Sequence, residues 1–356
     1  MNQADNNQGG INQGWALTDA ALAPLPRAEN FRLVERPMVR PAANQMLSRT
    51  IYISLDPYQW FYKLRGAEKP GNICHARTIS QVIESRLEGF SAGDYVFNTN
   101  GWARYGLTGE GVPRPGYMIP RKLDPAHGPI SYGVGVLGML GLTAYAGMIL
   151  EAQPRAGETA VISAASGGVG QIAGQLAKIR GCRVVGIAGA AEKCRYVVEE
   201  LGFDACVSHQ SATFGADLAG ACPNGVDVYF ENVGGAVFDA VAALFNMGAR
   251  MAFCGVIASL TDGSHTDPKQ ALLRRAREVL QARRVSVHDF SVGDYVAQHQ
   301  SAFLADMGPW VREGKVKYRE DIRQGLEETP RLFIELLRGG NFGKMLVQVS
   351  EDPTRA

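Results

Sequence analysis

The sequence predicts an α/β protein in two parts: a doubly wound parallel sheet and a separate β-rich domain. The chain has 356 residues, which is enough for roughly two domains of about 150 residues each. From residue 135 onward, short apolar segments alternate with helical patterns, as in a parallel sheet with right-handed crossovers. Before residue 130, short apolar segments are separated by Gly, Pro and Asp, which is typical of antiparallel strands joined by turns.

The composition is that of a globular protein without a strong overall charge. Hydrophobic residues make up 46% of the chain, charged residues 20%, and the formal net charge is +1. Such a chain has no field that would attract nucleic acid or an anionic membrane, so we expect neither as a partner. The uncharged stretch 132–150 contains five glycines, and we interpret it as buried core rather than a membrane helix.

The first domain begins after a polar N-terminus. Residues 1–14 are rich in Asn, Gln and Gly and predict a flexible tail, without the basic start and apolar centre of a signal peptide. The apolar runs that follow predict strands of a compact, mostly antiparallel domain, at residues 50–54, 79–83 and 95–97. Near the C-terminus a helix at 330–338 precedes a strand at 344–349, which is free to rejoin this first domain.

The second part has a regular alternation of strands and helices. A short apolar strand at 159–164 is followed by apolar residues at helical spacing, from Val169 to Ile179. A helix at 192–201 ends before Gly202. The other predicted strands lie at residues 183–188, 226–230 and 250–254.

A glycine-rich turn connects the strand 159–164 to its helix. Its sequence, A-S-G-G-V-G (165–170), fits G-x-G-x-x-G with Ala165 in the first position. Gly167 allows the backbone to approach a pyrophosphate, and Gly170 allows the helix to pack closely on the strand. The helix N-terminus offers free N–H groups and a positive dipole end to an anion. We therefore predict a dinucleotide-binding turn, because a nucleophile elbow at Ser166 would lack its first glycine.

The next strand predicts which nucleotide is bound. It ends in A-G-A-A (188–191), without the acidic residue that usually binds the ribose hydroxyls of NAD. Lys193 and Arg195 on the following helix bring positive charge suited to a 2′-phosphate. The sequence therefore favours NADPH/NADP+, the alternative being that Lys193 is a solvated lysine at a helix start.

Five segments, in one order over about 290 residues, carry a family resemblance. They are S-L-D-P-Y (54–58), G-M-L-G-L-T-A-Y (138–145), S-A-A-S-G-G-V-G (163–170), F-E-N-V-G-G (230–235) and N-F-G-K (341–344). At these residues the chain resembles a medium-chain dehydrogenase/reductase. More narrowly, it is similar to the zinc-free alkenal/one oxidoreductase branch, which includes prostaglandin reductases, plant double-bond reductases and curcumin reductase.

The resemblance implies how the chain divides. It implies a GroES-like substrate domain formed by residues 15–134 and 304–356, and a Rossmann NADP-binding domain at residues 135–303, with a cleft between them. It also implies NADPH as hydride donor and a homodimer. With six cysteines at no metal-ligand spacing, at positions 74, 182, 194, 206, 222 and 254, we further expect a cytoplasmic protein with reduced thiols.

The resemblance also implies positions for the cofactor site. Gly168 and Val169 would line the pyrophosphate beside Gly167 and Gly170, and Gly189 and Lys193 would surround the 2′-phosphate. The residues that would lie along the cofactor toward the nicotinamide are Asn232, Cys254, Phe290, Ser291 and Val292. Asn341 would reach the cofactor from the C-terminal segment. No metal is expected, because Cys74 and His75 are adjacent, which is a poor spacing for a shared zinc ion.

Three positions depart from the family pattern. Leu260 stands where this branch commonly has a Tyr that fixes the substrate carbonyl. Gln59 and Trp60 replace Met-Arg, so Trp60 is either an aromatic wall of the substrate site or a core residue. His209 replaces a Tyr often found near the 2′-phosphate, and it is either a phosphate contact or an ordinary loop histidine.

The resemblance implies an NADPH-dependent reductase of activated C=C bonds in α,β-unsaturated ketones or aldehydes. Tyr58 would face a hydrophobic or aromatic enone and hold the enolate oxygen by a hydrogen bond. Two alternatives stay open at this point. Leu260 leaves room for reduction of a ketone or quinone without a metal, and a third possibility is an NADPH-binding protein without turnover.

Overall fold

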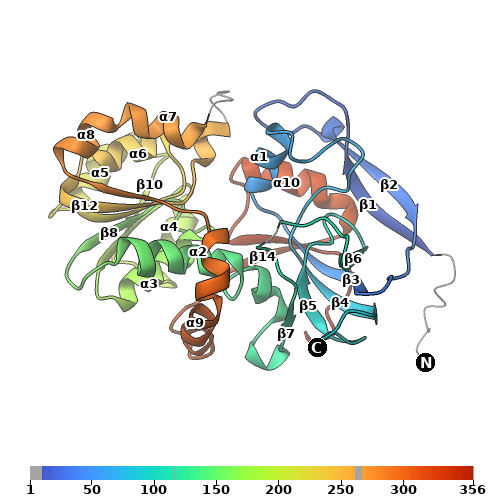
Figure 1. Cartoon of the computed structure of the whole chain (residues 1–356). Helices are drawn as coiled ribbons and strands as arrows, with labels where there is room; N and C mark the ends of the chain where they lie inside the picture. Colours follow the sequence, from blue (N-terminus) through green and yellow to red (C-terminus); the bar gives the residue numbers. More distant parts are fainter. Residues whose placement is uncertain (1–9, 116, 261–266, 356) are drawn as a thin grey trace. The chain divides into compact units, whose positions relative to one another are not determined.

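The computed structural model describes residues 10–115, 117–260 and 267–355, with the side chain of Leu260 excepted. The chain forms two compact units (Figure 1). Unit 1 comprises Met1–Val134, Ile322–Arg338 and Leu346–Ala356, and unit 2 comprises Gly135–Asp321 and Gly339–Met345. The boundaries on the C-terminal side therefore differ from the expected one at residue 304, since residues 304–321 and 339–345 belong to unit 2.

Unit 1 is built on antiparallel strands. Strands β1 (Ile11–Leu17) and β2 (Phe31–Pro37) form a two-stranded sheet. A second sheet has the order β14-β15-β3-β4-β5-β7, with β6 also paired to β3. Its strands are β3 (Gln45–Ser54), β4 (Thr78–Ser85), β5 (Tyr95–Asn98), β6 (Tyr105–Gly109), β7 (Arg121–Leu123), β14 (Glu320–Gln324) and β15 (Lys344–Gln348).

The C-terminal strand returns to the first part of the chain. Leu346 in β15 pairs antiparallel with Ser54 in β3. The C-terminal strand therefore rejoins the first domain, a possibility that the sequence left open. The helices of unit 1 are short: α1 (Tyr58–Leu64), α10 (Thr329–Leu337), and the 3-10 helices η1 (Ala28–Asn30), η2 (Pro125–His127), η3 (Ile130–Val134) and η6 (Leu326–Glu328).

The predicted N-terminal tail is partly structured. Residues 1–9 lie outside the described residues, but Ile11 to Gly14 belong to β1 and not to a loose tail. Gly14 pairs with Val34 of β2, and the main chain of Trp15 donates to the carbonyl oxygen of Trp102. Backbone pairing therefore places residues 11–14 in a strand, although their polar composition does not show the alternation of a strand.

Unit 2 holds the parallel sheet that the sequence predicts. The strand order is β10-β9-β8-β11-β12-β13, and every neighbouring pair is parallel. The strands are β8 (Thr159–Ile162), β9 (Arg183–Ala188), β10 (Ala205–Ser208), β11 (Val226–Glu231), β12 (Phe245–Phe253) and β13 (Ser286–Asp289). The order reverses direction between β8 and β11, and ligands of such folds bind at the carboxyl ends of strands at this point.

Helices cover both faces of this sheet, with α5 to α8 on one face and α3 on the other (Figure 1). They are α2 (Met139–Tyr145), α3 (Gly170–Ile179), α4 (Ala191–Glu199), α5 (Phe214–Ala221), α6 (Gly235–Ala242), α7 (Pro268–Arg275), α8 (Arg277–Ala282) and α9 (Gly293–Arg312). A π-helix, η4 (Ala146–Ala152), continues α2, and a 3-10 helix, η5 (Ile257–Leu260), follows β12.

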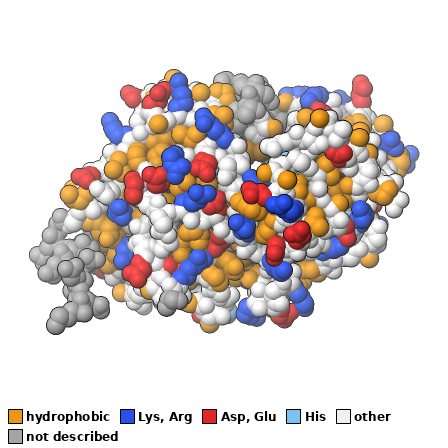
Figure 2. Space-filling view, turned by 180° about the vertical axis from the view of Figure 1, so that it is seen from behind, with side chains coloured by type: hydrophobic (Ala, Val, Ile, Leu, Met, Phe, Trp, Pro, Cys, Tyr) orange, Lys and Arg blue, Asp and Glu red, His pale blue; other side chains and the backbone are white. Residues whose placement is uncertain are grey.

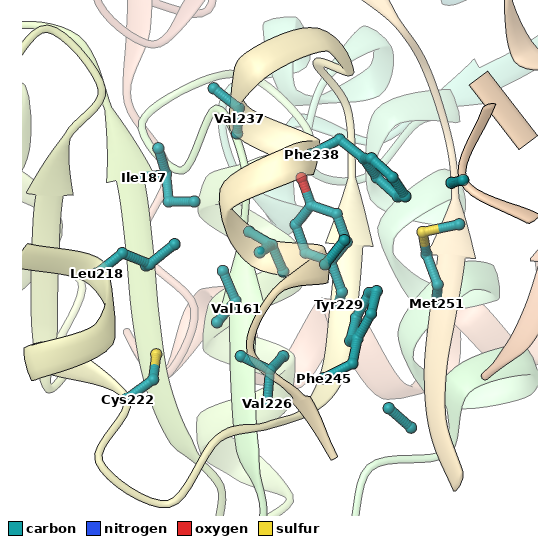
Figure 3. Packing of buried hydrophobic residues seen from close by; sticks show 14 of the residues in the cluster. Val161, Ile187, Leu218, Cys222, Val226, Tyr229, Val237, Phe238, Phe245 and Met251 are labelled. Carbon is teal, nitrogen blue, oxygen red and sulfur yellow. The ribbon is translucent and has the colours of Figure 1, made fainter. Parts of the chain in front are cut away.

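One hydrophobic cluster joins the sheet of unit 2 to the helices on one face. Val161 and Tyr229 from the sheet pack with Leu218 of α5 and Phe238 of α6 (Figure 3). Each of these four side chains is essentially inaccessible to water. Burial of such side chains stabilises the fold by about 1.5–3 kcal/mol each, and this rigid layer holds the strand ends in place.

The surface carries charges of both signs. Figure 2 shows Lys and Arg interspersed with Asp and Glu on the face that it presents, in keeping with the net charge of +1. Within the described residues, no helix combines the length and the apolar character needed to span a bilayer.

Candidate functional site

The predicted glycine turn lies between β8 and α3, at the carboxyl end of the sheet. The Gly167 amide donates to the carbonyl oxygen of Ala164 at 2.9 Å, and Ala164 has a left-handed backbone with φ of 48°. A Cβ on Gly170 would lie 2.2 Å from that same carbonyl oxygen. Only glycine therefore fits at position 170, because the helix starts directly against the end of the strand.

The turn also has the features that a diphosphate requires. A Cβ on Gly168 would meet the side chain of Leu140 at 2.5 Å, so backbone alone occupies this position. Val169 immediately precedes α3, a ten-residue helix with no acidic residue in its first turn. Its free N–H groups and dipole are suited to bind an anion. The close packing of the turn and the start of α3 therefore fit the diphosphate of a dinucleotide.

The ends of β9 and β10 bring Gly189, Lys193 and His209 together. A Cβ on Gly189 would lie 3.4 Å from Nε2 of His209, and the His209 amide donates to Ala188 at 3.0 Å. Burial lowers the pKa of His209, and the positive charge of nearby Lys193 lowers it further. Burial likewise lowers the pKa of Lys193. Lys193 and His209, two partly buried basic groups beside Gly189, therefore fit a phosphate. Arg195, the other basic residue predicted here, is exposed on α4.

The segment 339–345 packs against this region, which places Asn341 nearby. Nζ of Lys193 donates to the carbonyl oxygen of Gly339 at 2.8 Å, and a Cβ on Gly168 would lie 3.4 Å from Cδ of Lys344. The Asn341 side chain donates to the carbonyl oxygen of Gly343 at 2.7 Å. The C-terminal segment is thereby fixed against the glycine turn from the same unit.

Two side chains that the sequence interpretation missed hold this segment. Oε1 of Gln171, in the first turn of α3, accepts the Arg319 amide at 2.9 Å, and its Nε2 donates to the Arg319 carbonyl oxygen at 3.1 Å. The Arg319 guanidinium lies 3.8 Å from the ring centre of Phe342, a cation–π contact. Gln171 follows Gly170 directly, but its partner is 148 residues away, and no local pattern indicates it.

Asn232 and Cys254 lie at the carboxyl ends of β11 and β12. The amide of Asn232 donates to Oγ of Ser163 at 2.7 Å, and its side chain donates to the Ser163 carbonyl oxygen at 2.8 Å. Buried Glu231 accepts Oγ–H of Ser163 at 3.0 Å and the amides of Val233 and Gly234. This network fixes Asn232 at the point where the strand order reverses. Burial raises the pKa of Cys254 to about 12, so its thiol stays protonated.

Phe290, Ser291 and Val292 follow β13 at the same edge of the sheet. Phe290 contacts Phe230 edge-on at a centroid distance of 6.5 Å, and a Cβ on Gly147 would lie 2.8 Å from Cζ of Phe290. Ser291 accepts the amide of Asp294 through its carbonyl oxygen, and Val292 precedes α9. All the predicted cofactor residues therefore belong to unit 2.

In unit 1, Tyr58 belongs to a cluster of four polar aromatic side chains, Tyr58, Tyr62, His75 and Tyr117, here called the Tyr58 cluster. The Tyr58 hydroxyl lies 3.1 Å from Nε2 of His75, and the hydroxyls of Tyr62 and Tyr117 are 3.3 Å apart. Tyr62 packs edge-on against Tyr58 and stacks on His75. The sequence interpretation missed Tyr62, although its position four residues after Tyr58 places both on one helix face.

A buried ion pair supports the Tyr58 ring. Arg77 binds Asp56 at 3.0 Å, and its guanidinium lies 4.9 Å from the centre of the Tyr58 ring. Burial raises the pKa of Tyr58 above its usual value, although the Arg77 charge opposes the shift. The phenol therefore keeps its proton at neutral pH and is able to donate a hydrogen bond.

Of the two possibilities left open for Trp60, the structure supports the core residue and not the wall of a substrate site. Its side chain is fully buried, and its Nε1–H donates to the carbonyl oxygen of Pro24 at 2.8 Å. The ring packs with Phe31, which also contacts Trp102. Trp60 is a core residue, and its indole is closed off from any ligand. Leu260 ends η5, but its side chain lies outside the described residues.

Cys74 and His75, the adjacent pair considered for zinc, have different surroundings. The Cys74 side chain is buried, whereas the His75 ring faces Tyr58. Within the described part of the chain, no group of three or more His, Cys, Asp or Glu side chains is arranged to hold a metal ion.

Comparison with known proteins places this geometry in a family. The family model described as "Zinc-binding dehydrogenase" matches residues 168–295, and "N-terminal domain of oxidoreductase" matches residues 14–112. The "NADPH-dependent curcumin reductase" of Escherichia coli (strain K12) is 40% identical over 350 residues, which cover 96% of this chain and 98% of that protein. The "2-alkenal reductase (NADP(+)-dependent)" of Nicotiana tabacum is 35% identical, with 88% of this chain and 90% of that protein covered.

Solved structures of related proteins have the same fold as this chain. The crystal structure of CurA from Vibrio vulnificus in complex with NADPH has a TM-score of 0.84 and 39% identity, and the match covers 96% of this chain and 100% of that one. The quinone oxidoreductase of Escherichia coli shares the fold, with a TM-score of 0.73 at 18% identity over 94% of this chain and 99% of that one. The chain therefore belongs to the medium-chain dehydrogenases/reductases, in the alkenal/one oxidoreductase branch that its sequence resembles.

Proposed function

We propose that the protein is an NADPH-dependent reductase of activated carbon–carbon double bonds in α,β-unsaturated ketones or aldehydes. The observation that carries this proposal is the tight glycine turn before α3, where a Cβ on Gly170 would meet the Ala164 carbonyl oxygen, together with Lys193 and His209 at the next strand end. The relatives named as curcumin and alkenal reductases support the same reaction class.

The bound NADPH supplies the hydride that reduces the β-carbon of the enone. The chain holds this cofactor through residues of unit 2. Gly168, Val169 and the start of α3 bind the diphosphate through backbone N–H groups, and Gly167, whose own amide donates to Ala164, lets the backbone come close to it. Lys193 and His209 bind the 2′-phosphate by charge-assisted hydrogen bonds. The network of Glu231, Ser163 and Asn232 keeps the nicotinamide end of the site rigid.

The substrate oxygen needs a hydrogen-bond donor, because hydride addition at the β-carbon leaves negative charge on it. We assign this donor to the Tyr58 hydroxyl. Its phenol is neutral at physiological pH and is held by a buried ion pair beneath the ring. The α-carbon then receives a proton from solvent or from a hydroxyl group. The aromatic faces of the Tyr58 cluster favour a hydrophobic or aromatic enone.

We further propose that the protein is a cytoplasmic homodimer. Its cysteines would stay reduced.

The test follows NADPH oxidation against a panel of aromatic and aliphatic enones, with NADH as the control. The proposal expects NADPH to be strongly preferred and the product to be a saturated ketone. An allylic alcohol as product would identify a carbonyl reductase instead. Tight NADPH binding without turnover on any enone or quinone would identify a binding protein. Tyr58→Phe with unchanged turnover would remove the assignment of Tyr58.

A further inference from the structure

His75 is a partly buried imidazole whose Nε2 atom has a hydrogen-bond partner within the described residues. That partner is the Tyr58 hydroxyl at 3.1 Å, and the two residues are 17 positions apart in the chain. The backbone around His75 is fixed, since its amide donates to Oε2 of Glu68, which also binds Lys63 in a buried ion pair. Tyr62 stacks on the face of the imidazole ring. The imidazole is therefore held in one place against Tyr58.

The surroundings keep His75 neutral. Burial, together with the positive charges of Arg77 and Lys63, lowers its pKa to about 4, and Asp56 opposes this only in part. At pH 7 the ring has one N–H, on either Nδ1 or Nε2. His75 consequently holds no spare proton to give to the substrate. What it can do is determine the direction of the Tyr58 hydrogen bond.

A phenol has one hydrogen and can accept hydrogen bonds through its oxygen. If Nε2 of His75 is an acceptor, the Tyr58 hydrogen points at the imidazole and is lost to the substrate. If Nε2 carries the hydrogen, it donates to the Tyr58 oxygen and leaves the phenolic hydrogen free to point elsewhere. Donation to the phenol also strengthens its own O–H as a donor, because hydrogen bonds in a chain polarise one another.

We propose that His75 is a positioning residue for the reductase reaction, with its Nε2–H donating to Tyr58 so that the phenolic hydrogen is directed at the substrate oxygen. This inference rests on the proposed function, in which Tyr58 contacts the substrate. It assigns a role to a residue that the sequence interpretation considered only as a zinc ligand. No proton is transferred in this step, and His75 remains neutral throughout.

A double-mutant cycle on kcat tests the role. His75→Ala should lower kcat with an enone by about fivefold to tenfold, the value of one hydrogen bond in a polar network. In the Tyr58→Phe background the same change should alter kcat less than about twofold, because the hydroxyl that His75 positions is gone. His75→Gln, whose side-chain amide is also a donor, should recover most of the lost kcat. His127→Ala removes an exposed histidine of η2, also in unit 1; it is the matched control and should stay near the wild-type rate.

The outcome of the cycle decides between positioning and packing. Equal losses in both backgrounds would mean that His75 only supports the fold, and the proposal would be wrong. A wild-type rate for His75→Ala would overturn it as well. The Kd of NADPH, measured by fluorescence, should be unchanged in all of these variants, because the predicted cofactor residues belong to unit 2.

A second measurement does not depend on turnover. In protein labelled with 15N at histidine, NMR at pH 7 should show the His75 hydrogen on Nε2. A hydrogen on Nδ1 would overturn the proposal whatever the kinetics show. If Nε2 carries the hydrogen but the wild-type protein reduces no enone, the proposed function fails while the assigned direction of the hydrogen bond stands.

Discussion

A Cβ atom on Gly170 would lie only 2.2 Å from the carbonyl oxygen of Ala164. This relationship fixes how closely α3 begins against β8, and therefore how near a diphosphate can come to the free amides of the turn. The contact is with backbone, so no flexible side chain can move to make room.

We predict that Gly170→Ala weakens both the fold and cofactor binding. Overpacking of this kind costs about 1–3 kcal/mol of stability, and the Kd for NADPH should rise at least about tenfold as the turn shifts. Thermal unfolding and fluorescence titration measure the two effects. Gly220→Ala is the control, because a Cβ there meets no atom within 4 Å in α5, and it should leave NADPH binding unchanged. Normal NADPH affinity in Gly170→Ala would show that the turn does not bind the diphosphate.

Lys193→Ala should remove much of the preference for NADPH over NADH. Loss of one charge-assisted contact to a 2′-phosphate is worth about 1.5–3 kcal/mol, or roughly 10-fold to 150-fold in the Kd of NADPH. The Kd of NADH should change little, since that cofactor lacks the phosphate. Calorimetry on both nucleotides checks this. Lys315→Ala removes the same charge from an exposed position and should affect neither. Equal weakening of NADH and NADPH by Lys193→Ala would contradict the assignment.

The neutral state of His75 predicts how stability depends on pH. Its pKa is about 4 in the folded protein and 6.5 in an unperturbed chain. As the pH falls below 6.5, the unfolded chain binds a proton that the folded protein does not, so stability falls. The loss is complete near pH 4 and amounts to roughly 3 kcal/mol.

Urea unfolding of the wild type and of His75→Gln at pH 7, 6, 5 and 4 measures this contribution. The carboxylates titrate in both proteins, so the difference between the two curves isolates residue 75. We expect the wild type to lose stability more steeply over this range. Parallel curves would mean that His75 is not held neutral by its surroundings.

Trp60 should behave as a core residue. Trp60→Phe deletes the donor to Pro24 and leaves part of the core unfilled, so it should reduce stability by about 1–3 kcal/mol. The KM for an enone should stay within about twofold of the wild type, because the indole is closed off from ligands. Tyr58→Phe should show the reverse pattern, with stability kept and kcat lowered. A large change in KM without loss of stability in Trp60→Phe would restore the substrate role.

Local patterns were enough to predict four of the six strands of the parallel sheet in unit 2, although not β10 and β13. The strand at 159–164, the glycines and the helix from Val169 lie next to one another in sequence, and the structure gives β8 and α3 there. The same holds for Gly189 and Lys193, which are only four positions apart. In these places the spacing of a few neighbouring residues determines the geometry.

The parts that could not be predicted depend on distant partners. Residues 339–345 are held in unit 2 by Lys193, which donates to Gly339 from 146 positions earlier. They are also held by Arg319, which contacts Phe342 and whose backbone Gln171 binds from 148 positions earlier. His75 has no periodic pattern that connects it to Tyr58. By residue type alone, Trp60 is compatible with a core or a ligand site. The hydrogen bonds from its indole to the carbonyl oxygens of Ala23 and Pro24, which come from a distant loop, place it in the core. Ile11 enters β1 because β2 offers backbone partners.

In the proposed reaction, this chain directs a hydride from NADPH to the β-carbon of an enone. The most direct measurement uses NADPH carrying deuterium at C4 of the nicotinamide and an aromatic enone, with the product analysed by NMR. The account predicts a saturated ketone with deuterium on the carbon β to the carbonyl. Deuterium on the carbinol carbon of an allylic alcohol, or an enone recovered without label while NADPH stays unoxidised, would contradict it.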